Sequence, residues 1–212
     1  MSEARREKHA RVKGILFDFD GTLTIPGALD FPAIKKALGC PPDLPILEYL
    51  ETLPPPRKGP LLEILERSEE QAAQHSLPNK GAEDCLDVLM RKGLMFGILT
   101  RNSLQSLQKA FEKFMRLNLR SFAAIITRED CLPKPHPDGV RRAARDMGVF
   151  PHELLVVGDF RFDIIAGYEA GARTVLLTNG RAPVLFPEDP APDYTVDCLE
   201  ELPVIVDRIN LL

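Results

Sequence analysis

Hydrophobic positions divide the chain into a regular part and an interruption. From residue 81 onward, short apolar runs alternate with segments whose apolar residues recur at helical spacing. The runs Leu-Leu-Val-Val at 154–157 and Thr-Val-Leu-Leu at 174–177 lack polar alternation, which is typical of parallel strands buried on both faces. This alternation predicts an α/β fold with a doubly wound, Rossmann-like parallel sheet.

The same pattern predicts the individual elements. Strands are expected at residues 12–17, 94–99, 122–126, 154–157, 173–177 and 194–196. Helices are expected at residues 81–92, 104–114, 138–147, 163–170 and 199–212. Ser103 is placed to cap the second of these helices, and Gly148 and Gly171 follow the ends of the third and fourth.

Residues 25–78 break this rhythm. Seven prolines fall between Pro41 and Pro60. Only short helix candidates accompany them, at residues 31–38, 44–53 and 61–75. We expect a core domain of residues 1–24 and 79–212 and a small α-helical cap inserted at residues 25–78. In the alternative, these helices simply pack on the core.

Two carboxylates, Asp18 and Asp20, follow the first expected strand. Side chains alternate along a strand, so both acids can project together at its carboxyl end. Adjacent acids repel each other without a cation, and hard oxygen ligands suit Mg²⁺. Gly21 then turns the chain, and Thr22 supplies a supporting hydroxyl. The alternative is a strand followed by an ordinary acidic turn.

Thr100 and Lys134 are expected at the same edge, because ligands of doubly wound sheets bind beyond the carboxyl ends of the strands. The Thr100 hydroxyl and the backbone N–H of Arg101 can hold phosphate oxygens. A threonine in this position also often caps a helix. Lys134 lies between Pro133 and Pro135, which restrict the backbone and can aim its ammonium group, although most lysines are exposed.

Two more acids, Asp159 and Asp163, follow the strand expected at 154–157. Asp159 suits the completion of a Mg²⁺ site. Asp163 can hold a metal-bound water, or it can stabilise the first turn of a helix through the dipole. His136 is expected to be a turn residue rather than an acid–base catalyst.

These segments, in this order, resemble the motif set of the haloacid dehalogenase (HAD) superfamily over about residues 12–180. The insert is similar to the cap of the phosphoglycolate phosphatase-like and β-phosphoglucomutase-like branch. The resemblance implies a Mg²⁺-dependent phosphatase that hydrolyses a small phosphorylated metabolite. Asp18 would be the nucleophile that forms an aspartyl-phosphate, and Asp20 would protonate the leaving alcohol and then activate water.

The resemblance also implies the ligands. Mg²⁺ would be held by the Asp18 carboxylate, the main-chain carbonyl of Asp20, Asp159 and water. Phosphate would be bound by Thr100, the backbone N–H of Arg101 and Lys134. Dehalogenases and phosphonatases of the superfamily lack an acid at the position of Asp20, so its presence favours phosphate esters.

The sequence departs from the family pattern in two places. Phe160 stands where many relatives carry Ser or Thr, which affects the surroundings of the expected metal ligand Asp159. Arg161 and Phe162 are expected to shape the mouth of the site instead. The insert is shorter than many phosphoglycolate phosphatase caps, and no specificity motif maps onto it.

Two other functions compete with the phosphatase interpretation. A phosphomutase of the β-phosphoglucomutase type shares the core, and a non-catalytic binding protein on this fold would have lost at least one reacting residue. Phosphoglycolate, sugar phosphates and nucleoside monophosphates all remain open as substrates. Arg57 and Lys58 in the insert either meet an anionic group of the substrate or are exposed loop charges.

Composition narrows the setting. The net charge of −4 gives no nucleic-acid footprint, and no apolar run approaches the roughly 20 residues that span a bilayer. The N-terminal segment lacks the apolar stretch of a secretory signal. Its basic residues are expected to form a solvated leader: Arg5, Arg6, Lys8, Arg11 and Lys13. Four widely spaced cysteines are expected to be reduced thiols of a cytoplasmic protein, and the oligomeric state is open.

Overall fold

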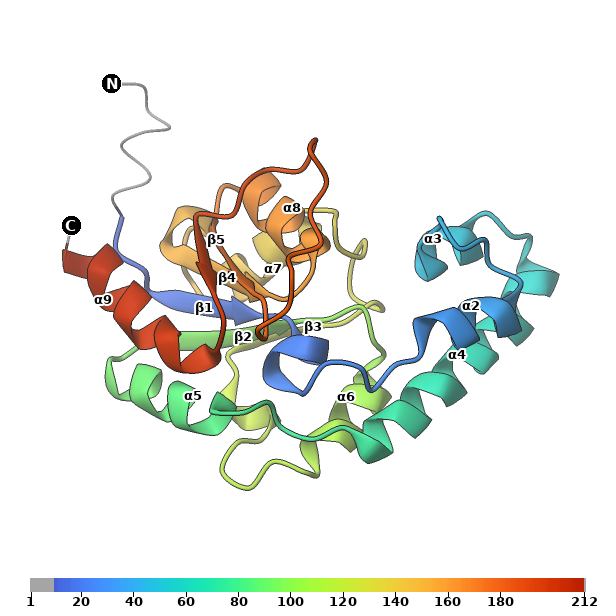
Figure 1. Cartoon of the computed structure of the whole chain (residues 1–212), viewed down its shortest axis with the longest axis horizontal. Coiled ribbons are helices and arrows are strands. Elements are labelled where there is room, and N and C mark those ends of the chain that lie inside the picture. Colours follow the sequence, from blue (N-terminus) through green and yellow to red (C-terminus); the bar gives the residue numbers. More distant parts are fainter. Residues whose placement is uncertain (1–9, 212) are drawn as a thin grey trace.

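A six-stranded parallel sheet in the order β3-β2-β1-β4-β5-β6 organises the chain in this computed structural model, which describes residues 10–211 (Figure 1). The strands are β1 (Gly14–Phe17), β2 (Met95–Leu99), β3 (Ala124–Ile126), β4 (Leu154–Gly158), β5 (Arg173–Leu177) and β6 (Tyr194–Val196). Every neighbouring pair runs parallel. The predicted doubly wound α/β fold is therefore confirmed. Arg5, Arg6, Lys8 and Leu212 lie outside the described residues.

Strand β1 lies at the centre because it is apolar on both faces. All four of its residues are buried, and it pairs with β2 on one side and β4 on the other. Phe17 is level with Ile98 and with Val157. This register brings the segments that follow β1, β2 and β4 to one edge of the sheet.

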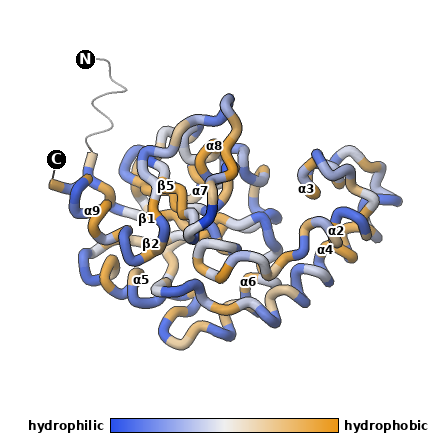
Figure 2. The backbone as a smooth tube through the Cα atoms, in the orientation of Figure 1, coloured by the Kyte–Doolittle hydropathy of each residue, from blue (hydrophilic) through white to orange (hydrophobic). Residues whose placement is uncertain are grey.

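Helices cover both faces of the sheet (Figure 1). The first face carries α5 (Ala82–Arg91), α6 (Leu104–Phe111) and α9 (Leu202–Leu211), which share one hydrophobic cluster with the strands. The second carries α7 (Asp138–Asp146) and α8 (Arg161–Ala170), which share another. Figure 2 shows hydrophobic residues concentrated in the middle of this region, around β5 and α8.

Helix α8 approaches the sheet closely because Gly167 has no side chain. A Cβ atom at this position would lie 2.6 Å from the Thr174 side chain and 3.2 Å from that of Val156. Four short turns complete the described elements: η1 (Phe19–Leu23), η2 (Leu119–Ser121), η3 (Pro151–Glu153) and η4 (Leu199–Glu201).

Three helices make up the segment between β1 and α5: α2 (Phe31–Leu38), α3 (Ile46–Glu51) and α4 (Pro55–His75). They have a hydrophobic cluster of their own, which includes Ile34, Leu50 and Leu65. Helix α4 also packs against α6, so one helix connects this insert to the core. The chain enters and leaves the insert side by side, because Thr24 and Pro78 form an isolated antiparallel bridge.

The predicted start of α4 at residue 61 is wrong by six positions. Pro55 and Pro56 occupy the first turn, where a backbone N–H has no partner within the helix, so proline loses no hydrogen bond there. Arg57 and Lys58 are therefore helical residues rather than loop charges. Lys58 Nζ lies 2.7 Å from Glu51 Oε1 on α3.

The other helices differ from expectation mainly at their ends. Helix α3 covers residues 46–51 of the predicted 44–53, α6 stops at Phe111, and α8 begins two residues early at Arg161. The predicted final helix is divided into η4 and α9. Within the described residues, no helix combines the length and apolar character that crossing a membrane requires.

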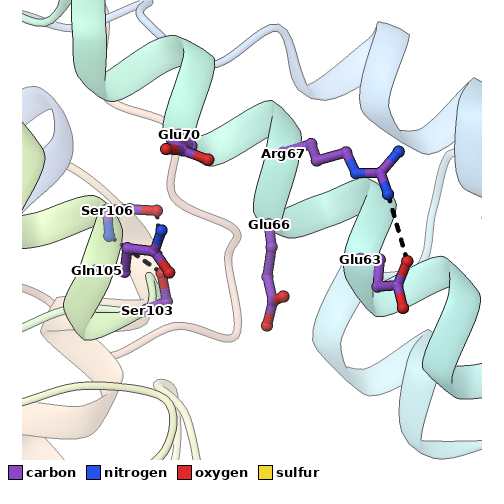
Figure 3. A pocket seen from close by; sticks show the side chains of 7 residues that line it. All are labelled: Glu63, Glu66, Arg67, Glu70, Ser103, Gln105 and Ser106. Atoms are coloured by element: carbon purple, nitrogen blue, oxygen red, sulfur yellow. Dashed lines mark hydrogen bonds and ion pairs between the residues drawn. The ribbon is translucent and has the colours of Figure 1, made fainter.

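Ser103 caps α6 as predicted, because its Oγ accepts a hydrogen bond of 3.2 Å from the backbone N–H of Ser106. A hollow of about 220 Å³ lies between this helix start and α4. Figure 3 shows its lining: Glu63, Glu66, Arg67 and Glu70 from α4, and Ser103, Gln105 and Ser106 from the start of α6.

Leu107→Ala should lower the free energy of unfolding by about 2–5 kcal/mol, because Leu107 is fully buried against the sheet and truncation leaves a cavity. Leu104→Ala is the control on the same helix. Leu104 is 43% exposed, so we expect a change of about 0.5 kcal/mol. Urea denaturation followed by circular dichroism measures both, and equal losses would contradict this packing.

Candidate active site

The carboxyl ends of the central strands border a cavity of about 620 Å³. Asp18 follows β1, Thr100 follows β2, and Asp159 follows β4. Lys134 reaches the same cavity from the loop between β3 and α7. The insert supplies the opposite wall, which includes Phe31 of α2. Residues predicted from four separate motifs therefore lie around one space.

Lys134 is buried, with 3% of its surface exposed. Its Nζ lies 2.5 Å from Asp18 Oδ1 and 2.6 Å from Asp163 Oδ1. Burial lowers the pKa of Lys134, but the carboxylates of Asp163 and Asp18 outweigh burial and raise the pKa above its ordinary value. The ammonium group therefore stays charged.

Three acids gather beside this ammonium group. One carboxylate oxygen each from Asp18, Asp159 and Asp163 lies within 4.8 Å of the other two. Burial, and then repulsion from Asp18 and Asp163, raises the pKa of Asp159. Among the described residues, Asp159 has no hydrogen-bond or ion-pair partner. Crowded carboxylate oxygens with one unpaired member fit a hard divalent cation.

Gly21 lets the chain pass close to this cluster. Its φ is +78°, and a Cβ atom there would lie 2.0 Å from Asp159 Oδ2. The turn is also held from outside. Asn179 Nδ2 donates to the Gly21 carbonyl at 2.7 Å, and Asn79 Nδ2 donates to the Thr22 carbonyl at 2.9 Å. Thr22 itself is fully buried, and its Oγ1 has no partner within the described part of the chain.

Asp20 points away from the acid cluster toward Asn102. Its Oδ2 accepts a hydrogen bond of 2.5 Å from Asn102 Nδ2. Burial, and then repulsion from Asp18, raises the pKa of Asp20 to about 7. The carboxyl group of Asp20 does not belong to the three-acid cluster, so only its main-chain carbonyl is compatible with the predicted metal role.

Asn79, Asn102 and Asn179 were not predicted as site residues. Asn102 stands two positions after Thr100, at the end of an expected strand. That position is a weak indication that Asn102 belongs to the site. Asn79 and Asn179 lie 100 positions apart and donate to one turn. Nothing in the local sequence of either indicates this arrangement.

Thr100 and Arg101 lie where predicted, but the Arg101 side chain has an additional partner. Thr100 Oγ1 accepts from the backbone N–H of Asn102 at 3.1 Å, which leaves its hydroxyl hydrogen able to donate. Arg101 Nη2 lies 2.6 Å from Glu48 Oε2 on α3, and Nη1 donates to the Lys134 carbonyl. Arg101 therefore connects the core to the insert.

His136 behaves as the turn residue that the sequence predicted. Its backbone N–H donates to the Pro133 carbonyl, and its Nδ1 accepts from the backbone N–H of Asp138 at 3.3 Å. Arg57 and Lys58 do not line the cavity. An interaction of either residue with a substrate in this cavity is therefore not supported.

Arg161 and Phe162 line the cavity, as predicted for residues at its mouth, and Phe160 lines it as well. The backbone N–H of Phe160 donates to Asp163 Oδ2 at 3.2 Å. The bulky side chain therefore leaves this backbone contact intact.

Comparison with known proteins identifies the family. The model of the haloacid dehalogenase-like hydrolases matches residues 32–177. An uncharacterised hydrolase from Saccharomyces cerevisiae is 31% identical over 94% of this chain and 93% of its own length. The chain belongs to the haloacid dehalogenase-like hydrolase family. The predicted family is thereby confirmed.

Two further proteins are similar to this HAD-like hydrolase over nearly its whole length. The N-acetylmuramic acid 6-phosphate phosphatase of Pseudomonas aeruginosa is 29% identical over 95% of this chain and 97% of its own. A predicted phosphoglycolate phosphatase from Haemophilus somnus, solved by crystallography, has a TM-score of 0.69 and 19% identity. It covers 92% of this chain and 98% of its own, which shows that the fold extends through the insert.

Gly21→Ala should weaken Mg²⁺ binding at least about tenfold, because the new Cβ displaces Asp159. Gly93→Ala is the matched control: its φ is also +78°, but nothing lies within 4 Å of its Cβ position. Both variants lose about 1–2 kcal/mol to backbone strain. Thermal unfolding over a Mg²⁺ titration separates the effects, and an unchanged Mg²⁺ response in Gly21→Ala would contradict the assigned contact.

Proposed function

We propose that the protein is a Mg²⁺-dependent phosphatase that hydrolyses a small phosphorylated metabolite through an aspartyl-phosphate on Asp18. The contact of Lys134 Nζ with Asp18 Oδ1 carries this proposal. This contact holds a carboxylate in the wall of the cavity, beside an ammonium group that can neutralise an incoming phosphate. The name of the relative that acts on N-acetylmuramic acid 6-phosphate supports the same reaction type.

In the first step, a carboxylate oxygen of Asp18 attacks phosphorus, and the bond between phosphorus and the alcohol oxygen breaks. Asp20 gives its proton to that oxygen. In the second step, water attacks the phosphorus and passes a proton to Asp20. The bond between phosphorus and the Asp18 oxygen breaks, and this releases Asp18 and inorganic phosphate. The hydrogen bond from Asn102 holds the Asp20 carboxyl group in one orientation throughout.

The phosphate would be bound by the Thr100 hydroxyl, the backbone N–H of Arg101 and Lys134. Among the described residues, that N–H has no hydrogen-bond partner, so it is available to a ligand. Lys134 would balance the charge of both the phosphoryl group and the attacking carboxylate.

Mg²⁺ would be held by the carboxylates of Asp18 and Asp159 and by the Asp20 main-chain carbonyl, with Asp163 in support. When bound, it would supply positive charge to the phosphoryl oxygens during transfer. The unpaired carboxylate of Asp159 in a crowded acidic cluster supports this assignment.

Residues 25–78 would act as a cap that closes over the substrate and excludes bulk water. The contact between Arg101 and Glu48 supports this role, because it joins the phosphate-binding turn to α3 across the cavity. Arg101 also donates to the Lys134 carbonyl, so a closed cap would hold Lys134 in place as well.

Asp18→Asn should reduce the hydrolysis of p-nitrophenyl phosphate by about 10³-fold or more, because an amide cannot act as the nucleophile. The wild type should lose activity in EDTA and recover it with Mg²⁺. Asp207→Asn, on α9 and paired with Lys92, is the control and should retain activity. Turnover that survives Asp18→Asn would exclude the proposed nucleophile.

Glu48→Gln should lower kcat/KM about 1.4- to fivefold at low salt, because a partly exposed ion pair across the cavity contributes about 0.2–1 kcal/mol. Added salt should reduce kcat/KM of the wild type more than that of the variant. Glu51→Gln is the control, since Glu51 pairs with Lys58 inside the insert. Equal effects of the two variants would argue against a closing contact at Glu48.

A further inference from the structure

Two arginines on the cavity wall, Arg101 and Arg161, are already paired with carboxylates. Arg101 makes two contacts with the Glu48 carboxylate, at 2.9 and 2.6 Å. Arg161 makes two with Asp189, one of them at 2.7 Å. A second anionic group on a substrate would have to displace a seated carboxylate from either guanidinium group.

The remaining charged residues on this wall are of both signs, so the wall has no concentrated positive charge for a second anion. Lys35 Nζ donates to the Pro42 carbonyl at 2.6 Å, and Asp43 lines the same cavity. Glu69 adds a carboxyl group that is 4% exposed and bound by Arg128. Of the described lining residues, this leaves Lys35, which contacts only a carbonyl, and the exposed Arg181 without an ion-pair partner.

Apolar side chains dominate the rest of the wall, and several are unusually exposed. Phe31 of the insert is 53% exposed, and Val184 and Phe186 of the loop after β5 are 58% and 49% exposed. All three line the cavity, together with Leu29, Leu47 and Phe160. Large apolar groups in contact with water around a concave site are the usual sign of an apolar ligand.

Aromatic contacts hold the core side of this wall in place. The Arg161 guanidinium lies 4.1 Å from the centre of the Phe186 ring, and Asp189 fixes that guanidinium. Phe160 and Phe162 pack edge to face at 4.9 Å. Arg161 therefore supports an aromatic surface rather than offering its charge to a ligand.

We propose that the substrate is the phosphate monoester of an apolar, ring-bearing alcohol that has no second anionic group. Phe31 and Phe186 are the specificity-determining residues, and they contact the alcohol portion from the insert and from the core. This assignment rests on the proposed phosphatase function, because that function places the phosphate at Asp18 and the alcohol against this wall.

The test compares kcat/KM for 2-phenylethyl phosphate and 2-phosphoglycolate, which both release primary alcohols. Acetyl phosphate, whose leaving group is too small to reach the wall, reports the phosphatase reaction itself. We expect 2-phenylethyl phosphate to be preferred over 2-phosphoglycolate at least tenfold. In Phe31→Ala and Phe186→Ala, kcat/KM for 2-phenylethyl phosphate relative to acetyl phosphate should fall at least fivefold, mainly through KM.

Phe150→Ala is the matched control. Phe150 is 66% exposed, stacks on His152 and does not line the cavity. Its removal should therefore leave kcat/KM for 2-phenylethyl phosphate unchanged relative to both 2-phosphoglycolate and acetyl phosphate. A preference for 2-phosphoglycolate, or ratios in Phe31→Ala and Phe186→Ala equal to the wild type, would overturn the assignment while Asp18-dependent hydrolysis of acetyl phosphate upheld the phosphatase. Absence of Asp18-dependent hydrolysis of all three phosphate compounds would overturn both.

Discussion

The buried ammonium group of Lys134 is the interaction on which the site depends. It contacts Asp18, 116 positions away in the sequence, and Asp163, 29 positions away. Carboxylates this close in a protein interior would take up protons or move apart without a positive charge among them. The strand order β3-β2-β1-β4 places the segments after these strands at one edge of the sheet, so the fold brings Asp18, Lys134 and Asp163 together.

The sequence predicts the strands and the acidic residues well for a shared reason. Each acid directly follows an apolar run, and parallel order places the ends of those runs at one edge of the sheet. Asp18 and Asp159 can thus be located without knowledge of long-range contacts. Asn79 and Asn179 cannot be located in this way, because their role is to donate hydrogen bonds to main-chain carbonyls of a distant turn. No periodicity or local motif encodes such a contact.

The insert was harder to predict for a local reason and for a spatial one. Consecutive prolines usually indicate a loop, yet Pro55 and Pro56 begin a helix, because the first turn of a helix has no use for their missing N–H groups. Arg101 shows the spatial limit. Its place after β2 indicates a backbone role in phosphate binding, but its side chain reaches Glu48 on α3, a partner that only the folded arrangement of the insert provides.

The bridge between Thr24 and Pro78 has a consequence for how the sequence of this protein can evolve. The two ends of the insert meet at neighbouring positions, where Ile25 also hydrogen-bonds to Leu77, so the core receives both at nearly one point. A longer, shorter or differently folded segment between these ends would leave the path of every core strand unaltered, at a small cost in loop-closure entropy. Residues around the cavity can therefore diverge through the exchange of one segment, while the proposed catalytic residues remain fixed beyond the ends of the core strands.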